Sequence, residues 1–280
     1  MADLEQWIGK SETREEVIAP FPSNALAATL DRDDPLYGDG TPLPPLWHWL
    51  HFLSIFKLSD AGYDGHEALG GFLPPVPLPR RMWAGSRLKF FAPMAIGKRL
   101  RKVSTVKSIV AKTGRSGRLV FVTVGHQLFD GSCLGIDEEH DIVYREEADP
   151  AAAPLAPPQA PVDSAFQREI QPDPVLLFRY SALTFNGHRI HYDHPFCVDC
   201  EGYHGLVVHG PLIATLLLDL LRRNKPDALV TRFDFRAVST IFANESFSLH
   251  GKAGGDGRCF SLWAQRADGT LAMDATAHIA

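Results

Sequence analysis

The sequence predicts an α+β protein of two related halves, each an antiparallel sheet packed around a helix. The same order of signals occurs twice along the chain. An arginine opens an alternating strand at Arg87 and again at Arg232, and a later strand ends in an Asp-Gly turn, at 130–131 and again at 268–269. Asp-Gly between apolar runs is a strong hairpin signal. A duplicated unit explains this repeated order.

A buried helix is expected in the second half, in the segment "HGPLIATLLLDLLRRNKP" at 209–226. It is apolar almost all round, which is typical of a helix inside a core. Pro211 suits the first turn, and Asn224 and Pro226 end the helix. In the first half, Pro42 to Phe56 is expected to supply the matching helix or its lead-in. The segment "VLLFRYSALT" at 175–184 is expected to form a strand or another buried segment.

One low-complexity stretch divides the chain. Residues 148–161 are mostly alanine and proline, which predicts an extended, semi-stiff linker. We therefore expect an N-terminal repeat at 1–147 and a C-terminal repeat at 162–280.

Composition excludes several classes of protein. The chain has 280 residues, 45% of them hydrophobic, which is enough for a sizeable core. Its formal net charge of -5 argues against a nucleic-acid binder. The basic segment 97–118 is either a solvated strand pair or a patch for a phosphate-bearing ligand. The sequence has no apolar run long enough for a membrane span, no apolar signal core and no disulfide framework, so we expect a cytoplasmic protein.

A polar run stands between two apolar segments in the second half. The stretch "SALTFNGHRIHYD" at 181–193 contains Asn186, His188 and His191, and it precedes the predicted helix. Free backbone N–H groups at a helix start stabilise negative charge. An imidazole beside such a helix start suits chemistry on a thioester carbonyl.

These residues resemble the active-site motif of the MaoC-like hydratases, which have the hotdog fold. That motif has an Asp, an Asn two residues on, and a His five residues after the Asp. Asn186 stands at the Asp position, His188 at the Asn position and His191 at the His position. Val208-His209-Gly210 matches the family's entry into its central helix.

The sequence around this motif is similar to that of a narrower branch of the family, whose members have a double hotdog fold. That branch includes mitochondrial 3-hydroxyacyl-thioester dehydratases and bacterial hydratases of mesaconyl-CoA and itaconyl-CoA. The resemblance implies two fused hotdog repeats, with the catalytic motif only in the second. It also implies that the first repeat supplies the acyl-CoA groove.

The chemistry of hydration suggests a role for each motif residue. His191 is the natural base, because its ordinary pKa lies near neutral. Asn186 cannot be a base, so it would orient the water by hydrogen bonds. The resemblance implies that the Gly210 N–H receives the thioester oxygen.

Further residues are candidates for substrate binding. Arg80, Arg81 and Trp83 come from the first half, and an arginine can hold a carboxylate through two hydrogen bonds. The alternative for both arginines is that they are ordinary charged surface residues with no role in substrate binding. His188 and His209, like the nearby His204, are either substrate contacts or structural hydrogen-bonding groups.

The expected function is an enoyl-CoA hydratase, in the hydro-lyase class. Its expected substrate is a branched C5 dicarboxylic acyl-CoA, itaconyl-CoA or mesaconyl-CoA, converted to citramalyl-CoA as in itaconate degradation. No cofactor or metal is expected, since CoA is part of the substrate. A homodimer is plausible, because free sheet edges can pair.

The sequence offers four alternatives to this hydratase. One is a 3-hydroxyacyl-CoA or carrier-protein dehydratase of fatty-acid synthesis, and another is a non-catalytic acyl-thioester binding module. A thioesterase would need a carboxylate on the central helix, where only Asp219 stands, well inside. A zinc site at Cys197 and Cys200 lacks a second ligand pair.

Overall fold

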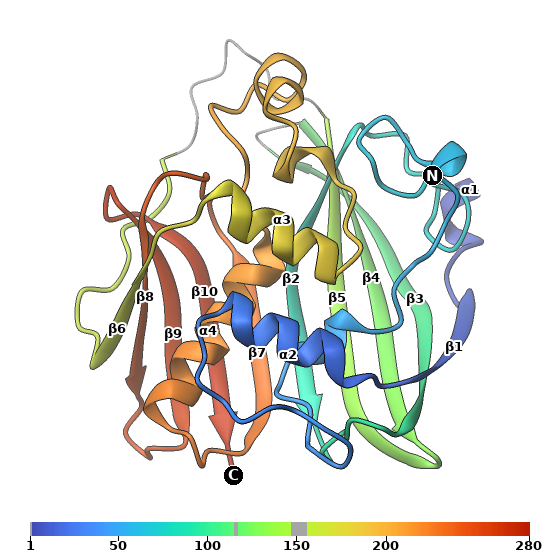
Figure 1. Ribbon diagram of the computed structural model, residues 1–280. Coiled ribbons are helices and arrows are strands. Elements are labelled where there is room, and N and C mark those ends of the chain that lie inside the picture. Colours follow the sequence, from blue (N-terminus) through green and yellow to red (C-terminus); the bar gives the residue numbers. More distant parts are fainter. Residues whose placement is uncertain (1, 115–116, 147–155) are drawn as a thin grey trace.

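The computed structural model describes residues 2–114, 117–146 and 156–280 (Figure 1). Its main feature is one antiparallel sheet of ten strands in the order β1-β3-β4-β5-β2-β7-β10-β9-β8-β6. The strands are β1 (Ser11–Val17), β2 (Arg80–Phe90), β3 (Arg99–Gly114), β4 (Gly117–Asp130), β5 (Cys133–Arg145), β6 (Phe166–Ile170), β7 (Val230–Ala237), β8 (Phe247–Ala253), β9 (Cys259–Arg266) and β10 (Leu271–Ile279).

The sheet has the same strand order on both sides of its centre. β2 and β7 pair at the middle, with Gly85 opposite Arg236 and Lys89 opposite Arg232. Outward from this pair, β5, β4, β3 and β1 on one side correspond to β10, β9, β8 and β6 on the other. The two strands that contain the repeated arginine signal are thus central neighbours, although β2 already begins at Arg80 and β7 at Val230. This is the arrangement that a duplicated unit gives.

The two Asp-Gly turns are where the sequence predicted them. Gly131 has a φ of 57° between β4 and β5, and Gly269 has a φ of 84° between β9 and β10. This left-handed backbone favours glycine, since other residues pay a steric penalty there.

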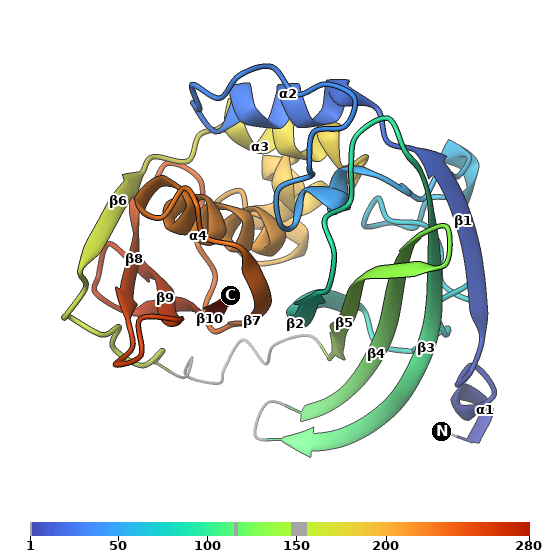
Figure 2. The ribbon, with the colours of Figure 1, turned by 90° about the horizontal axis from the view of Figure 1, so that it is seen from below.

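The helix predicted in the second half is confirmed as α4 (Gly210–Asn224). The sheet of the C-terminal half curves around it (Figure 2). Every residue from Leu212 to Leu221 is buried. These include Asp219, whose carboxylate forms ion pairs with three arginines, Arg32, Arg168 and Arg223.

The prediction that Pro42 to Phe56 supplies a matching helix or its lead-in is wrong, since no α-helix lies in the described stretch between α2 (Pro20–Thr29) and β2. Only one 3₁₀ turn forms there, η1 (Trp47–Leu50), and Leu46 before it has a left-handed φ of 71°. Pro44 and Pro45 have no N–H for a helical ladder, so the apolar run is buried without becoming a helix. The N-terminal half therefore has no counterpart of α4 in the described residues.

The prediction of a strand or buried segment at 175–184 is also corrected. This segment is α3 (Pro174–Leu183), and the Asp173 side chain caps it by accepting from the Leu176 N–H at 2.8 Å. Leu177 and Tyr180 are buried whereas Phe178 is exposed, so only one side faces the core. It lies beside α2 (Pro20–Thr29), which the sequence did not predict (Figures 1 and 2).

The remaining elements are short: α1 (Ala2–Glu5), η2 (Leu58–Asp60), η3 (Arg189–His191) and the π-helical turn η4 (Phe196–Cys200). Most of the expected linker, 148–161, lies outside the described residues. The domain limits 1–147 and 162–280 therefore stay predictions. No helix in the described ranges is long and apolar enough to cross a membrane.

Candidate active site

A cavity of about 640 Å³ is lined by residues of both halves. The C-terminal half contributes the polar run that contains Asn186, His188 and His191, together with Gly210 at the start of α4. The N-terminal half contributes residues of β2 to β5 and of the loops before β2. The polar run thus faces a space that neither repeat encloses by itself.

His191 stands at the end of η3 and is 7% exposed. Its Nδ1–H donates to the Val207 carbonyl oxygen at 2.7 Å, which leaves Nε2 without a proton. Burial lowers the pKa of His191 to about 3, against the opposing effect of the Val207 bond. The ring is therefore neutral at pH 7, and its Nε2 lone pair can accept a proton.

His209 supports His191 from behind. The two rings stack with centroids 3.6 Å apart and planes 17° apart. His209 is fully buried, and its Nε2 hydrogen bonds with Ser181 Oγ at 2.8 Å. The structure does not bring His209 into the cavity lining, so its position fits ring support rather than the substrate contact considered above.

Asn186 lines the cavity in a short turn. Its Oδ1 accepts the His188 backbone N–H at 3.0 Å, which is the local bond expected of an asparagine in a turn. Its Nδ2 has no hydrogen-bond partner among the described residues. The amide therefore has an N–H free to donate to a water or a substrate.

Gly210 is the first residue of α4 and lines the same cavity. The N–H groups of the first helical turn have no partner inside the helix, and the helix dipole places partial positive charge there. The arrangement suits an oxygen that becomes negative during a reaction.

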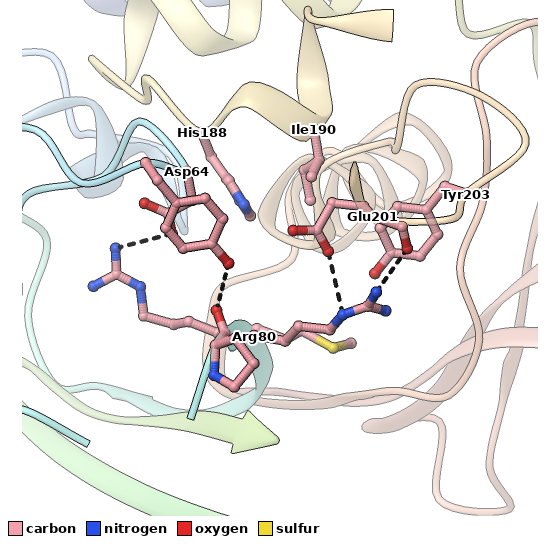
Figure 3. Close-up of a pocket in the computed structure, with 10 residues that line it drawn as sticks. Asp64, Arg80, His188, Ile190, Glu201 and Tyr203 are labelled. Atoms are coloured by element: carbon pink, nitrogen blue, oxygen red, sulfur yellow. Dashed lines mark hydrogen bonds and ion pairs between the residues drawn. The ribbon is translucent and has the colours of Figure 1, made fainter. Parts of the chain in front are cut away.

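The two neighbouring arginines lie in different surroundings, and Figure 3 shows Arg80 beside Glu201. Arg80 forms an ion pair with the Glu201 carboxylate at 3.4 Å and donates to the Glu201 carbonyl at 2.8 Å. It lines a small adjacent cavity of about 20 Å³ and is not among the residues that line the large one. Arg81 lines the large cavity, with Nη2 3.9 Å from Asp64 Oδ2. Trp83 also lines the large cavity, and its Nε1–H donates to Ser86 Oγ at 3.0 Å.

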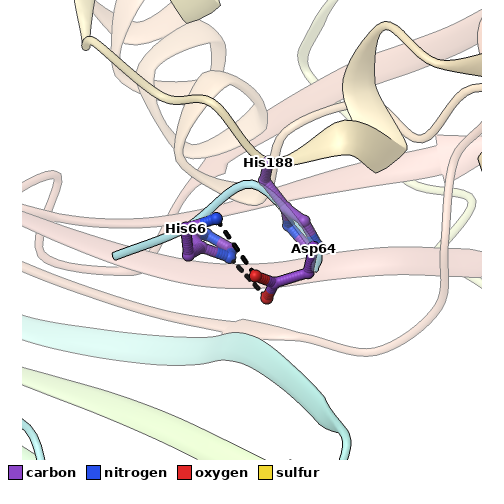
Figure 4. Close-up of side chains that lie close together, drawn as sticks. All are labelled: Asp64, His66 and His188. Carbon is purple, nitrogen blue, oxygen red and sulfur yellow. Dashed lines mark hydrogen bonds and ion pairs between the residues drawn. The ribbon is translucent and has the colours of Figure 1, made fainter. Parts of the chain in front are cut away.

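Sequence reasoning missed two residues of the first half, Asp64 and His66. His66 Nδ1 lies 2.9 Å from Asp64 Oδ2, and the His66 ring is 4.1 Å from the His188 ring (Figure 4). His188 in turn lies 5.4 Å from His191 by ring centroids. The signal available in the sequence was "GYDGHE", where an Asp and a His flank a glycine in a turn.

The N-terminal part of the cavity wall is unusually polar. Glu138 is buried and accepts from Trp49 and Ser86, and it pairs with His48 at 3.1 Å. Burial alone would raise the pKa of Glu138, but His48 holds it well below its ordinary value. The cavity lining beside it includes Lys102, His126 and His140.

The donor atoms of Asp64, His66 and His188 lie within 4.8 Å of one another. A cation there would meet the guanidinium of Arg81, which already shares the Asp64 carboxylate. The arrangement therefore fits a hydrogen-bonded carboxylate and imidazole better than a metal centre. The Cys197–Cys200 pair gives no site either: Cys197 is buried and its Sγ contacts the Ile190 carbonyl, whereas Cys200 is exposed.

Comparisons with known proteins show which family the sequence matches. Residues 46–243 match the model of the family described as hydroxyacyl-thioester dehydratase type 2. The chain is 46% identical over 278 residues to the mesaconyl-C(4)-CoA hydratase of Chloroflexus aurantiacus, covering 99% of this chain and 98% of that protein.

Solved structures of low identity share the fold. HtdX of Mycobacterium tuberculosis superposes with a TM-score of 0.68 at 17% identity, covering 95% of this chain and 98% of that one. Another protein of the same organism, described as having a double hotdog fold, gives 0.57 at 14% identity, covering 97% and 96%. The double hotdog fold expected from the sequence is confirmed.

Proposed function

Because the chain belongs to the type 2 hydroxyacyl-thioester dehydratase family, whose members are hydro-lyases, we propose that it hydrates a branched C5 dicarboxylic acyl-CoA. Itaconyl-CoA or mesaconyl-CoA would be the substrate and citramalyl-CoA the product, as in itaconate degradation. One observation carries the proposal most strongly. His191 lines a cavity that also contains the N-terminal turn of α4, and its Nδ1 bond to Val207 leaves Nε2 as the unprotonated nitrogen.

The reaction begins with a water held between His191 and Asn186. The Asn186 Nδ2–H donates to the water oxygen, and His191 Nε2 accepts one of the water's protons. In mesaconyl-CoA, where the double bond is conjugated to the thioester, the oxygen then bonds to the β-carbon, and the electrons of the double bond move toward the thioester oxygen. His191 returns its proton to the α-carbon, so water is added and no other reactant is needed.

Negative charge develops on the thioester oxygen during this addition. The Gly210 N–H at the start of α4 would receive that oxygen, aided by the dipole of a 15-residue helix. Removing one such donor in other enzymes costs about 10² to 10³ in rate. A backbone donor cannot be deleted by a side-chain change, so His191 gives the cleaner test.

The free carboxylate of a C5 diacid lies only a few bonds from the double bond, so its partner must stand near His191. Arg81 meets this requirement, since it lines the large cavity beside the Asp64–His66–His188 group. Arg80 is occupied by Glu201. We therefore assign the carboxylate to Arg81, with Trp83 and His188 as neighbouring walls.

The testing experiment is water addition by the purified protein, followed by mass spectrometry. Itaconyl-CoA, mesaconyl-CoA and crotonyl-CoA are compared with wild type and His191→Ala. Turnover of a dicarboxylic substrate is expected, with a loss of about 10² to 10⁴ in kcat for the variant. Turnover of crotonyl-CoA alone would contradict the dicarboxylic assignment, and binding without any turnover would indicate a binding module.

A second candidate is the dehydration of a longer 3-hydroxyacyl thioester on CoA or carrier protein. The cavity continues into the N-terminal half, where Leu73 and Ile142 line it and offer an apolar wall to an acyl chain. A rise in kcat/KM with chain length would favour this candidate. The cytoplasmic location and the homodimer, for which β1 and β6 are the free edges, stay predictions.

A further inference from the structure

A water that attacks carbon in this cavity needs a partner for each of its hydrogens. Asn186 would bind this water as a donor through Nδ2, and a water on that side of the amide cannot also reach Oδ1, one lone pair of which already accepts the His188 N–H. His191 Nε2 accepts one hydrogen of the water. The second hydrogen would lack a partner, and a polar group without one is costly in a buried site.

The first repeat supplies an acceptor of the right kind. The Asp64 carboxylate can only accept, so His66 Nδ1 carries the proton of their 2.9 Å bond and His66 Nε2 is left with a lone pair. His66 lines the same cavity as Asn186 and His191. Its ring packs on His188, which in turn contacts His191.

The loop that carries this pair is built against the catalytic loop. The Asp64 carbonyl accepts the Arg189 backbone N–H at 2.9 Å, and the Arg189 guanidinium donates to the Tyr63 carbonyl at 3.0 Å. Gly65 has a φ of 87° and packs so closely that a side chain there would collide with the Gly187 carbonyl. The two loops thus hold His66 in a fixed place relative to His191.

We propose that His66, oriented by Asp64, is a further catalytic residue that accepts the second hydrogen of the attacking water. This inference rests on the proposed function. His191 removes one proton from the water and returns it to the α-carbon. The other hydrogen stays on the new hydroxyl group, which donates it in a hydrogen bond to His66 Nε2. The active site then requires both repeats, because the acceptor comes from the half that lacks the motif.

The charged surroundings of His66 are consistent with a neutral acceptor. Asp64, Arg81, His188 and His191 face it. Burial lowers the pKa of His66, and Arg81 adds to this effect, against the raising influence of Asp64. A neutral ring whose Nδ1–H is fixed by a carboxylate keeps its lone pair directed away from that carboxylate.

The test compares His66→Ala and Asp64→Asn with wild type, on whichever acyl-CoA the wild type hydrates. Asn at 64 keeps the size of Asp but can donate to Nδ1, which would move the proton to Nε2 and abolish the acceptor. Both variants should lose about 10² in kcat with KM kept within about threefold. His204→Ala is the control, since His204 pairs with Glu245 and lies outside the cavity lining.

A rescue variant separates catalysis from loop structure. Asn186→Asp would place a new acceptor oxygen beside the water. The double variant His66→Ala/Asn186→Asp should therefore have a kcat at least tenfold higher than that of His66→Ala. Wild-type kcat in His66→Ala, or a loss accompanied by a lower melting temperature and a raised KM, would overturn the inference. So would stoichiometric zinc in the purified protein with activity lost to a chelator. A wild type that hydrates no acyl-CoA at all would remove the proposed function and this inference together.

Discussion

The two repeats share their strand order but differ in what lies against the curved sheet. The C-terminal repeat holds α4, whose residues 212–221 are all buried in the main core. The N-terminal repeat has only η1 in the corresponding stretch, and its sheet faces a cavity whose lining includes the charged residues Glu138 and Lys102 as well as apolar side chains. The comparison teaches that the repeat without a central helix leaves an open cavity, while the repeat with the helix places the start of α4 in the wall of that cavity.

Acidification should reveal how many neutral imidazoles the two repeats bury. Burial holds the pKa of His140 near 4 and of His191 near 3, below the ordinary value of about 6.5. The unfolded chain therefore binds more protons below pH 6.5, so stability is full above 6.5 and is lost as pH falls toward these values. Each such group contributes a slope of at most about 1.4 kcal/mol per pH unit.

Urea unfolding between pH 7.5 and 5.5 would measure this loss, which we expect to total several kcal/mol. His140→Gln should flatten the slope, because it removes one ring whose pKa is held low in the folded state. A stability that is constant over this range would contradict the buried, neutral state of these rings.

Removing core volume from either repeat should shift one common unfolding transition. Leu217 on α4 and Leu128 on β4 are both fully buried in the same core cluster, and the β2–β7 pair joins the halves into one sheet. Leu217→Ala and Leu128→Ala should each lose about 2–5 kcal/mol. Calorimetry and far-UV circular dichroism should show a single transition, and two separate transitions would show that the repeats unfold independently.

Replacing the buried carboxylate Glu138 of the N-terminal repeat should lower the stability of the fold more than replacing its more exposed neighbour Glu139. Glu138→Gln places an amide N–H₂ among the donors of Trp49 and Ser86, so a loss of about 1–3 kcal/mol is expected. Glu139→Gln removes only surface pairs with Arg87 and Lys107 and should cost below about 1 kcal/mol. Chemical denaturation of the two variants compares them, and equal losses would refute a structural role for the buried group.

The smallest expected effect concerns the adjacent arginines of β2. Arg81→Ala should raise KM about tenfold for a dicarboxylic acyl-CoA and leave crotonyl-CoA unaffected, because one charged hydrogen-bonding partner is lost. Arg80→Ala removes a contact to Glu201 outside the large cavity and should leave both KM values near wild type. Steady-state kinetics on the two substrates makes the comparison, and equal effects of both variants would reject the assignment of Arg81.

Local sequence patterns were sufficient to predict the elements whose structure depends on residues close together in the chain. The Asp-Gly turns, the repeated strands, α4 with Pro211 in its first turn, and the polar run with His191 all follow from short-range pattern. Periodicity failed at 175–184, where the apolar spacing predicts a strand or buried segment but the chain forms the one-sided helix α3. It failed at 42–56 because the apolar residues there indicate burial, whereas the prolines prevent the helix.

Only the tertiary structure decided which distant residues share the cavity. The sequence by itself determined the duplicated fold, the family motif and its candidate base. It could not show that Asp64 and His66 meet His188, that His209 stacks behind His191, or that Arg80 and Arg81 diverge. These relations depend on how β2 pairs with β7 and on how the loop around Gly65 docks on Gly187. Such long-range contacts arise from packing between the halves, which local residue patterns do not encode.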